Sequence, residues 1–224
     1  MVEYLINNNH KIYYLTIEHL YMVLLAIGIS IITAVPIGIL IHLYRKSTKI
    51  VITSANIIMT IPSIAMFGIM LTLLAPFNLS LGKVPAIIAI ILYNQLPIIS
   101  NTYIAIENID KNIVIAANGI GLSKWDVLKE ITIPLSIPVI LTGIRNASIL
   151  SIGIASIAAY IGSGGLGVLI QQGINRIYIE MILTGAILIS IIAIIVDLLL
   201  YFLEYLLTPK GILISLKNIK DENI

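Results

Sequence analysis

Long apolar blocks separated by short polar stretches are the main pattern along this chain. A helix that crosses a bilayer needs about 20 mainly apolar residues, and five blocks reach that length. We therefore predict five membrane helices, over residues 19–41, 50–75, 84–105, 136–161 and 182–207. Most of these segments contain a proline, which membrane helices tolerate when neighbouring helices or a cavity satisfy the freed backbone groups. The pattern is more typical of a bundle with a pathway than of a simple anchor.

The composition agrees with a membrane protein and excludes several other classes. Hydrophobic residues make up 59% of the 224 residues, charged residues only 11%, and the mean hydropathy is +1.06. A soluble domain carries roughly 25% charged residues, so this chain has too few to cover a water-facing surface. The net charge of +2 is too small to indicate nucleic-acid binding. Because the chain has no cysteine, disulfides and cysteine-ligated metal sites are excluded.

The basic residues predict the orientation in the membrane. Nine of them fall in the first loop, the third loop or the C-terminal segment, and only three fall on the opposite side. By the positive-inside rule, the richer side is cytoplasmic. We therefore expect residues 1–18 to lie outside the cytoplasm and residues 208–224 to form a cytoplasmic tail. The nine residues are Arg45, Lys46, Lys49, Lys111, Lys124, Lys129, Lys210, Lys217 and Lys220.

The cytoplasmic loop at residues 112–134 has the pattern of two short helices around a glycine turn. Ser123 and Asp126 have the spacing of a capping box that starts the second helix, and Pro134 is predicted to end it. Helices this short are marginal on their own. Trp125, the only tryptophan, would stay exposed unless the loop docked against a partner.

This loop resembles the EAA loop of bacterial ABC importer permeases. The resemblance rests on Ala116 and Ala117, followed by Gly121, and then on Ile131 and Pro134. In that family the loop forms a coupling helix that sits in a groove of the ATPase subunit, and the resemblance extends this role to Trp125. Two positions depart from the family pattern, which usually has glutamate in place of Ile115 and leucine in place of Ile133. The alternative is an ordinary amphipathic loop whose spacing matches by chance.

Further segments resemble the glycine betaine, carnitine and choline (osmoprotectant) branch of that superfamily. They are MTIPSIAMFGIM (59–70), LYNQLPIISNTY (92–103), GIRNASILSIGIASIAAYIGSGGLG (143–167) and DLLLYFLEYLLTPKG (197–211). The resemblance implies an all-α, type I ABC importer permease bundle over residues 19–207, in a bacterial cell membrane. It also implies three partners: a dimer of cytoplasmic ABC ATPases, a second permease copy, identical or different, and an external substrate-binding protein.

The third predicted span offers a candidate substrate pathway. Between residues 50 and 106 the only charged residue is Lys83, whereas this span is rich in polar and aromatic side chains. Aromatic faces attract quaternary ammonium groups by cation–π interaction, so the span suits a zwitterion such as betaine. Alternatively, its tyrosines favour the membrane interface and its polar groups join helices. The candidate residues are Tyr93, Asn94, Asn101, Thr102 and Tyr103.

Two charged residues lie inside apolar sequence. Arg145 and Asp197 each lie about nine or ten residues from the inner edge of their predicted spans, which corresponds to a depth of roughly 14–15 Å. A lone charge at that depth is costly, and intramembrane charges usually pair or face water. We therefore expect the two to pair or to share a polar cluster, with a structural role.

The sequence favours a transport subunit over an enzyme. GSGGLG at 162–167 has the spacing of a dinucleotide-binding turn but follows a membrane helix and lacks that motif's context. We interpret it either as tight packing at the outer mouth of the pathway or as a flexible loop. The three histidines are scattered, so we expect no catalytic site, metal or cofactor in this chain. The open alternatives are the same architecture for another solute such as methionine, an ion-driven secondary transporter, and an intramembrane enzyme.

Overall fold

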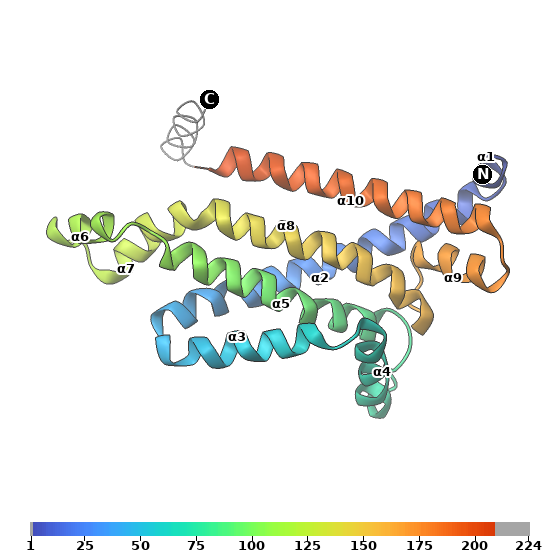
Figure 1. Ribbon diagram of the computed structural model, residues 1–224, viewed down its shortest axis with the longest axis horizontal. Coiled ribbons are helices and arrows are strands. Elements are labelled where there is room, and N and C mark those ends of the chain that lie inside the picture. Colours follow the sequence, from blue (N-terminus) through green and yellow to red (C-terminus); the bar gives the residue numbers. More distant parts are fainter. Residues whose placement is uncertain (1, 209–224) are drawn as a thin grey trace.

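The computed structural model describes residues 2–208, which form an elongated bundle of helices without a β-strand in that range (Figure 1). The long helices α2, α5, α8 and α10 run along the bundle, and α6 and α7 project from one end (Figure 1). The helices are α1 (Val2–Asn7), α2 (Asn9–Leu43), α3 (Arg45–Thr60), α4 (Ser63–Leu74), α5 (Lys83–Glu107), α6 (Lys111–Gly119), α7 (Lys124–Asp126), α8 (Ile133–Ile157), α9 (Gly167–Asn175) and α10 (Ile179–Leu207).

Four segments of the described chain are single helices long and apolar enough to cross a membrane. They are α2, α5, α10 and the continuous helical segment Lys124–Ile161, and each covers one of the predicted spans. The first starts earlier than predicted, at Asn9 rather than near residue 19, so most of the expected N-terminal segment is helical. The predicted tail at 208–224, Thr208 excepted, lies outside the described residues.

The predicted span at 50–75 is divided into two helices. Helices α3 and α4 meet at Ile61 and Pro62 with a bend of 101°, and only as a pair do they make a fifth candidate span. A residue before proline is pushed out of the helical region, and Ile61 accordingly has ψ of 127°. The Tyr93 hydroxyl of α5 donates a hydrogen bond to the Ile61 carbonyl oxygen, so the break is held from a neighbouring helix.

The prediction that Pro134 ends the loop's second helix is also wrong. The chain passes from α7 through a π-helical turn, Val127–Thr132, directly into α8, and Pro134 lies in the first turn of α8. A proline is tolerated at the start of a helix because its missing N–H has no intrahelical partner there. The wider π turn just before it starts a new hydrogen-bonding register. The second helix of the loop and the fourth span are therefore one continuous helix.

Helix α5 lies at the centre of the bundle, packed on α2, α3, α4 and α8. Small residues allow the close approach that membrane helices use. A Cβ on Gly38 would lie 2.5 Å from the Thr102 Cβ, and one on Gly143 would lie 2.6 Å from the Asn101 Cβ. Alanines buried in the same core fill the remaining contacts. The backbones of α2 and α8 therefore touch the third span directly.

Candidate functional site

The loop between α5 and α8 is built by local capping interactions. Asp110 caps α6 by accepting a hydrogen bond from the Asn112 backbone N–H at 2.8 Å. Gly121 has φ of +92°, a conformation that favours glycine and turns the chain between α6 and α7. Ser123 and Asp126 form the predicted capping box, in which the Asp126 backbone N–H donates to Ser123 Oγ at 3.2 Å. The helix–turn–helix prediction for this loop is confirmed.

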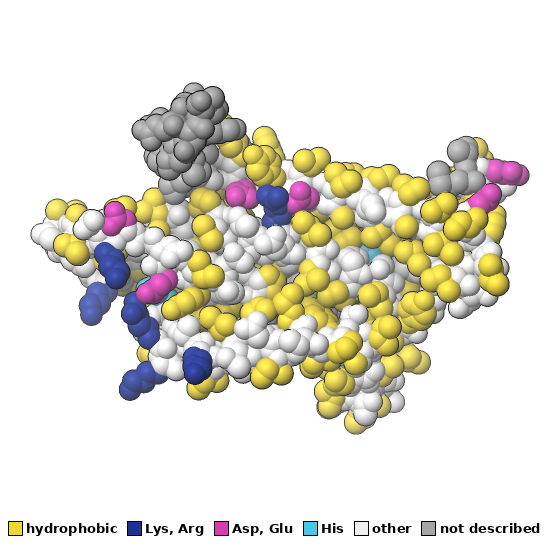
Figure 2. All heavy atoms as spheres, viewed as in Figure 1, with side chains coloured by type: hydrophobic (Ala, Val, Ile, Leu, Met, Phe, Trp, Pro, Cys, Tyr) yellow, Lys and Arg dark blue, Asp and Glu magenta, His cyan; other side chains and the backbone are white. Residues whose placement is uncertain are grey.

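The tip of this loop presents apolar side chains to its surroundings. Ile120 is 82% exposed and Trp125 is 65% exposed, although both are large and apolar. The two alanines of the motif differ, since Ala117 is buried and Ala116 is exposed. Exposed apolar groups at the end of a bundle mark a surface for a partner. Figure 2 shows that the Lys and Arg side chains of the visible face gather mainly at this same end.

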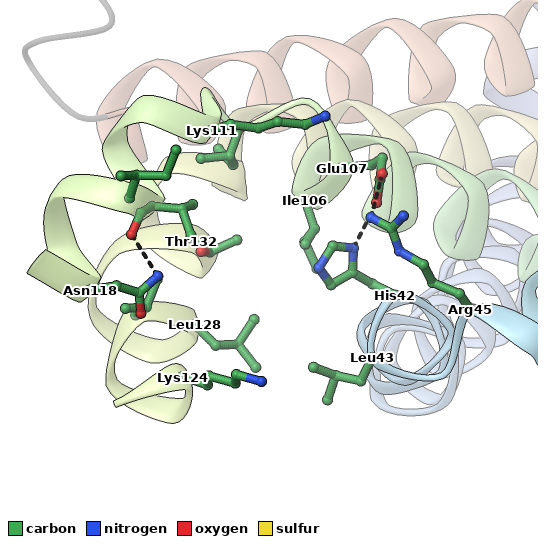
Figure 3. Close-up of a pocket in the computed structure, with 14 residues that line it drawn as sticks. His42, Leu43, Arg45, Ile106, Glu107, Lys111, Asn118, Lys124, Leu128 and Thr132 are labelled. Atoms are coloured by element: carbon green, nitrogen blue, oxygen red, sulfur yellow. Dashed lines mark hydrogen bonds and ion pairs between the residues drawn. The ribbon is translucent and has the colours of Figure 1, made fainter. Parts of the chain in front are cut away.

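A cavity of about 490 Å³ lies between the loop and the adjacent ends of α2, α3 and α5. On the bundle side, Glu107 accepts a hydrogen bond from Arg45 Nη2 at 2.8 Å and lies 3.1 Å from His42 Nδ1. On the loop side, Lys111 and Lys124 point across the gap (Figure 3). No pattern in the sequence predicts this cavity, because its lining comes from three separate segments.

The candidate pathway residues of α5 divide into a buried group and a part-exposed group. Asn94 is completely buried, and it donates to Ser30 Oγ at 3.2 Å and accepts from Ser151 Oγ at 2.9 Å. This network joins α2, α5 and α8. Tyr93 and Thr102 are buried as well.

Asn101 and Tyr103 are the part-exposed members of this set. Asn101 donates to the Pro97 carbonyl oxygen at 2.7 Å, one turn earlier in α5. The Tyr103 ring lies 6.5 Å from the His42 ring. The five residues therefore do not face a common space within one copy of the chain, and none of them lines the cavity beside the loop.

Arg145 of α8 and Asp197 of α10 form an ion pair, with 2.5 Å between Nε and Oδ1. A third charged residue, Glu204, lies two turns further along α10, with its Oε2 3.6 Å from Arg145 Nη1. Thr142 donates to the other carboxylate oxygen of Glu204 at 3.2 Å. Glu204 was not predicted from the sequence, although its spacing of seven residues from Asp197 places both carboxylates on the same helix face.

The glycine-rich segment at 162–167 contacts the N-terminal half of α2. Glu18 accepts a hydrogen bond from the Gly165 backbone N–H at 3.2 Å and pairs with Lys83 Nζ at 2.7 Å. Gly167 packs so closely that an added Cβ would lie 1.9 Å from the Ser156 carbonyl oxygen. Of the two interpretations given for this segment, close packing fits these contacts.

These features define a multi-pass membrane protein whose bundle carries a loop with exposed apolar side chains at one end. Residues 21–211 match the family described as the binding-protein-dependent transport system inner membrane component. The chain belongs to this family and is the permease subunit of an ABC importer. The match takes in the loop at residues 112–134 and all five predicted spans, apart from the first two residues of the first span. The family resemblance inferred from the sequence is therefore confirmed.

Several curated relatives are similar over nearly the whole chain. The osmoprotectant import permease protein OsmW of Salmonella typhimurium is 41% identical over 94% of this chain and 98% of its own length. The glycine betaine/carnitine/choline transport system permease protein OpuCB of Bacillus subtilis is 41% identical over 95% of each chain. The choline transport system permease protein OpuBB of Bacillus subtilis is 38% identical over 94% of this chain and 95% of its own length.

Solved structures support the fold at lower identity. The inward-facing MetNI methionine ABC transporter matches with a TM-score of 0.76 at 20% identity, over 88% of this chain and 96% of the other. An amino acid ABC transporter with histidines matches with a TM-score of 0.69, also at 20% identity, over 91% of this chain and 95% of the other. The bundle therefore has the type I ABC importer permease fold.

Proposed function

We propose that this chain is the membrane-spanning subunit of an importer for quaternary-ammonium osmoprotectants such as glycine betaine, carnitine and choline. The observation that carries the proposal is the similarity, at 38–41% identity and over nearly the full length, to permeases named for these solutes. The uncharged third span supports it, because a zwitterion with a quaternary ammonium group needs aromatic faces more than a counter-charge.

The proposed assembly has this permease paired with a second copy, identical or different, above a dimer of cytoplasmic ABC ATPases. An external binding protein delivers the solute to the opposite face. The gathering of basic side chains at the α6–α7 end supports a cytoplasmic position for that end. The N-terminus then lies outside and the tail at 208–224 inside a bacterial cell membrane. Hydrolysis takes place in the ATPase, and this chain itself is not an enzyme and carries no cofactor.

The proposed coupling works through a continuous helix. The exposed tip around Ile120, Gly121 and Trp125 docks in the ATPase, so closure of the ATPase dimer displaces the loop. Because the helical segment Lys124–Ile161 is continuous, the displacement passes into α8 as a rigid movement. The backbone contact of Gly143 with Asn101 then carries it into α5. We assign Ala116, Ala117, Ile131 and Pro134 to the positioning of this loop.

The proposed solute path follows the part-exposed side of α5 at Asn101 and Tyr103. In the described conformation Tyr93, Asn94 and Thr102 lie inside the protomer, so they line the path only after α5 moves relative to α2 and α8. Substituting Asn101 or Tyr103 should therefore change the apparent affinity for the solute. Unchanged transport kinetics in a well-expressed variant would contradict this assignment.

The test is uptake by proteoliposomes that contain the permease and its ATPase, with the binding protein supplied outside. ATP-dependent uptake of labelled glycine betaine should be inhibited by unlabelled carnitine or choline and unaffected by methionine. Inhibition by methionine but by none of the quaternary amines would contradict the proposed substrate class. Uptake driven by an ion gradient without ATP would contradict the importer mechanism.

A further inference from the structure

The cytoplasmic cavity combines a cationic rim with an apolar wall. Its rim carries Arg45, Lys111 and Lys124, and the carboxylate that faces them is Glu107. Glu107 is already engaged by Arg45 and His42. Lys111 and Lys124 have no ion pair with any residue in the described range 2–208. The cavity therefore has a surplus of positive charge on the loop side.

The wall of the cavity is apolar. Leu43, Ile106, Val114 and Leu128 contribute to it. Ile115, which stands where the resembled loop pattern has a glutamate, also lines it and is 66% exposed. A glutamate here would have offset the lysines, whereas isoleucine leaves both unpaired within residues 2–208 and extends the apolar wall. The cavity therefore suits a molecule that is both anionic and apolar.

The position of the cavity points to the source of such a molecule. Its lining includes His42 and Glu107, which lie at the ends of the apolar helices α2 and α5, where a span meets the membrane surface. Figure 3 shows Lys111 and Lys124 reaching across the gap toward these helix ends. Basic pockets between membrane helices on the cytoplasmic side bind anionic lipid head groups. An anionic head group at this level would lie between the two lysines, which border the gap on opposite sides, and its acyl chains would meet the apolar wall.

We propose that this cavity binds one anionic phospholipid of the cytoplasmic leaflet, with Lys111 and Lys124 on opposite sides of its anionic head group and Ile115 against its apolar part. The proposal rests on the proposed function only for the cytoplasmic position of this end. A bound lipid would contact α6, the π turn before α8 and the ends of α2 and α5 together. It would hold the coupling loop against the bundle and leave Ile120 and Trp125 free at the tip.

The test is native mass spectrometry of the full chain, delipidated in detergent and titrated with phosphatidylglycerol or with phosphatidylcholine of the same acyl chains. We expect a saturable adduct with phosphatidylglycerol only. Substituting Lys111→Gln and Lys124→Gln together should weaken it about 30-fold, since each lysine beside an anionic lipid contributes a factor of about five. The matched control is Lys46→Gln with Lys49→Gln, which removes the same charge from the same end outside the cavity lining.

A second pair of variants distinguishes lipid binding in the cavity from general attraction of lipid by the surface charge. Ile115→Glu should weaken phosphatidylglycerol binding, whereas Ile113→Glu, on the same helix but outside the lining, should leave it within about twofold. Gel filtration and circular dichroism check that each variant is folded.

Three results would overturn the proposal: equal binding of both lipids, equal loss in the two lysine pairs, or full displacement by inorganic phosphate, which would indicate a site for a free anion. These measurements use the isolated permease, so they succeed or fail independently of ATPase coupling and solute uptake.

Discussion

Arg145 and Asp197, which are 52 residues apart in the sequence, meet at 2.5 Å between α8 and α10. The pair lies partway along two membrane helices, and the Arg145 guanidinium also lies 5.5 Å from the centre of the Tyr201 ring. A charge in the hydrocarbon region is expensive unless it is paired. This pair therefore ties α10 to α8 partway along a helix that is largely exposed in a single copy.

Removing one member of this pair should destabilise the protein. Asp197→Asn leaves Arg145 with only the more distant Glu204, and we expect a loss of stability somewhat below the roughly 3 kcal/mol that an uncompensated charge in a membrane helix costs. Thermal unfolding in detergent, followed by gel filtration, measures the loss. Glu204→Gln is the matched control and should lose less stability, since it keeps the shorter contact between Arg145 and Asp197. Equal losses in the two variants would contradict the dominance of the Arg145–Asp197 contact.

Substitutions of Asn94 and Asn101 should differ in their effects on stability. Asn94→Ala removes two hydrogen bonds between helices and leaves Ser30 and Ser151 with only the bonds they donate to their own helix backbones, so we expect a loss of about 1–2 kcal/mol. Asn101→Ala removes one bond within α5 and should change stability little. Parallel melting curves of the two variants provide the comparison. A larger loss for Asn101→Ala would show that the inter-helix network is weaker than its burial indicates.

Gly167 should tolerate no side chain. The Cβ of Gly167→Ala would lie 1.9 Å from a backbone oxygen of α8, which must then move away from α9. Overpacking of this kind typically costs about 1–3 kcal/mol. Gly153→Ala, with nothing within 4 Å of its Cβ, is the control and should be neutral or slightly stabilising. The yield of monodisperse protein after detergent extraction measures the effect of both variants. A normal yield of Gly167→Ala would contradict the close packing.

Much of the fold follows from the sequence because its causes are local. The length of each apolar block determines where a span lies, and the spacing of Ser123 and Asp126 is sufficient for a capping box. The similar depths of Arg145 and Asp197 in their spans are enough to favour a contact between them, because a lone charge at that depth is costly. The loop motif is recognisable for the same reason, since its glycine and its alanines lie within one short segment.

The remaining features depend on contacts between distant segments. The bend at Ile61 and Pro62 becomes a turn of 101° where Tyr93 holds the exposed carbonyl. Pro134 by itself predicts a helix stop, yet the π turn before it lets the helix continue. Helix α9 was missed because glycines precede it and the segment is short. The burial of Asn94 follows from Ser30 and Ser151 on two other helices, which spacing within α5 does not reveal.

The central claim is that the α6–α7 loop joins this permease to an ATPase. The most direct test is co-purification of the tagged chain from its native membrane in mild detergent, with mass spectrometry of the bound proteins. We predict a P-loop ATPase with the unchanged chain and with Tyr44→Ala, which removes an exposed aromatic at the same end outside the loop.

Trp125→Ala should reduce the amount of co-purified ATPase about tenfold or more, as expected for the loss of an aromatic anchor. Gly121→Ala should also reduce it, because alanine is strained at φ of +92°. Expression of each variant is checked in the same membranes. Recovery of the chain without an ATPase in several detergents, or equal recovery with Trp125→Ala, would contradict the account.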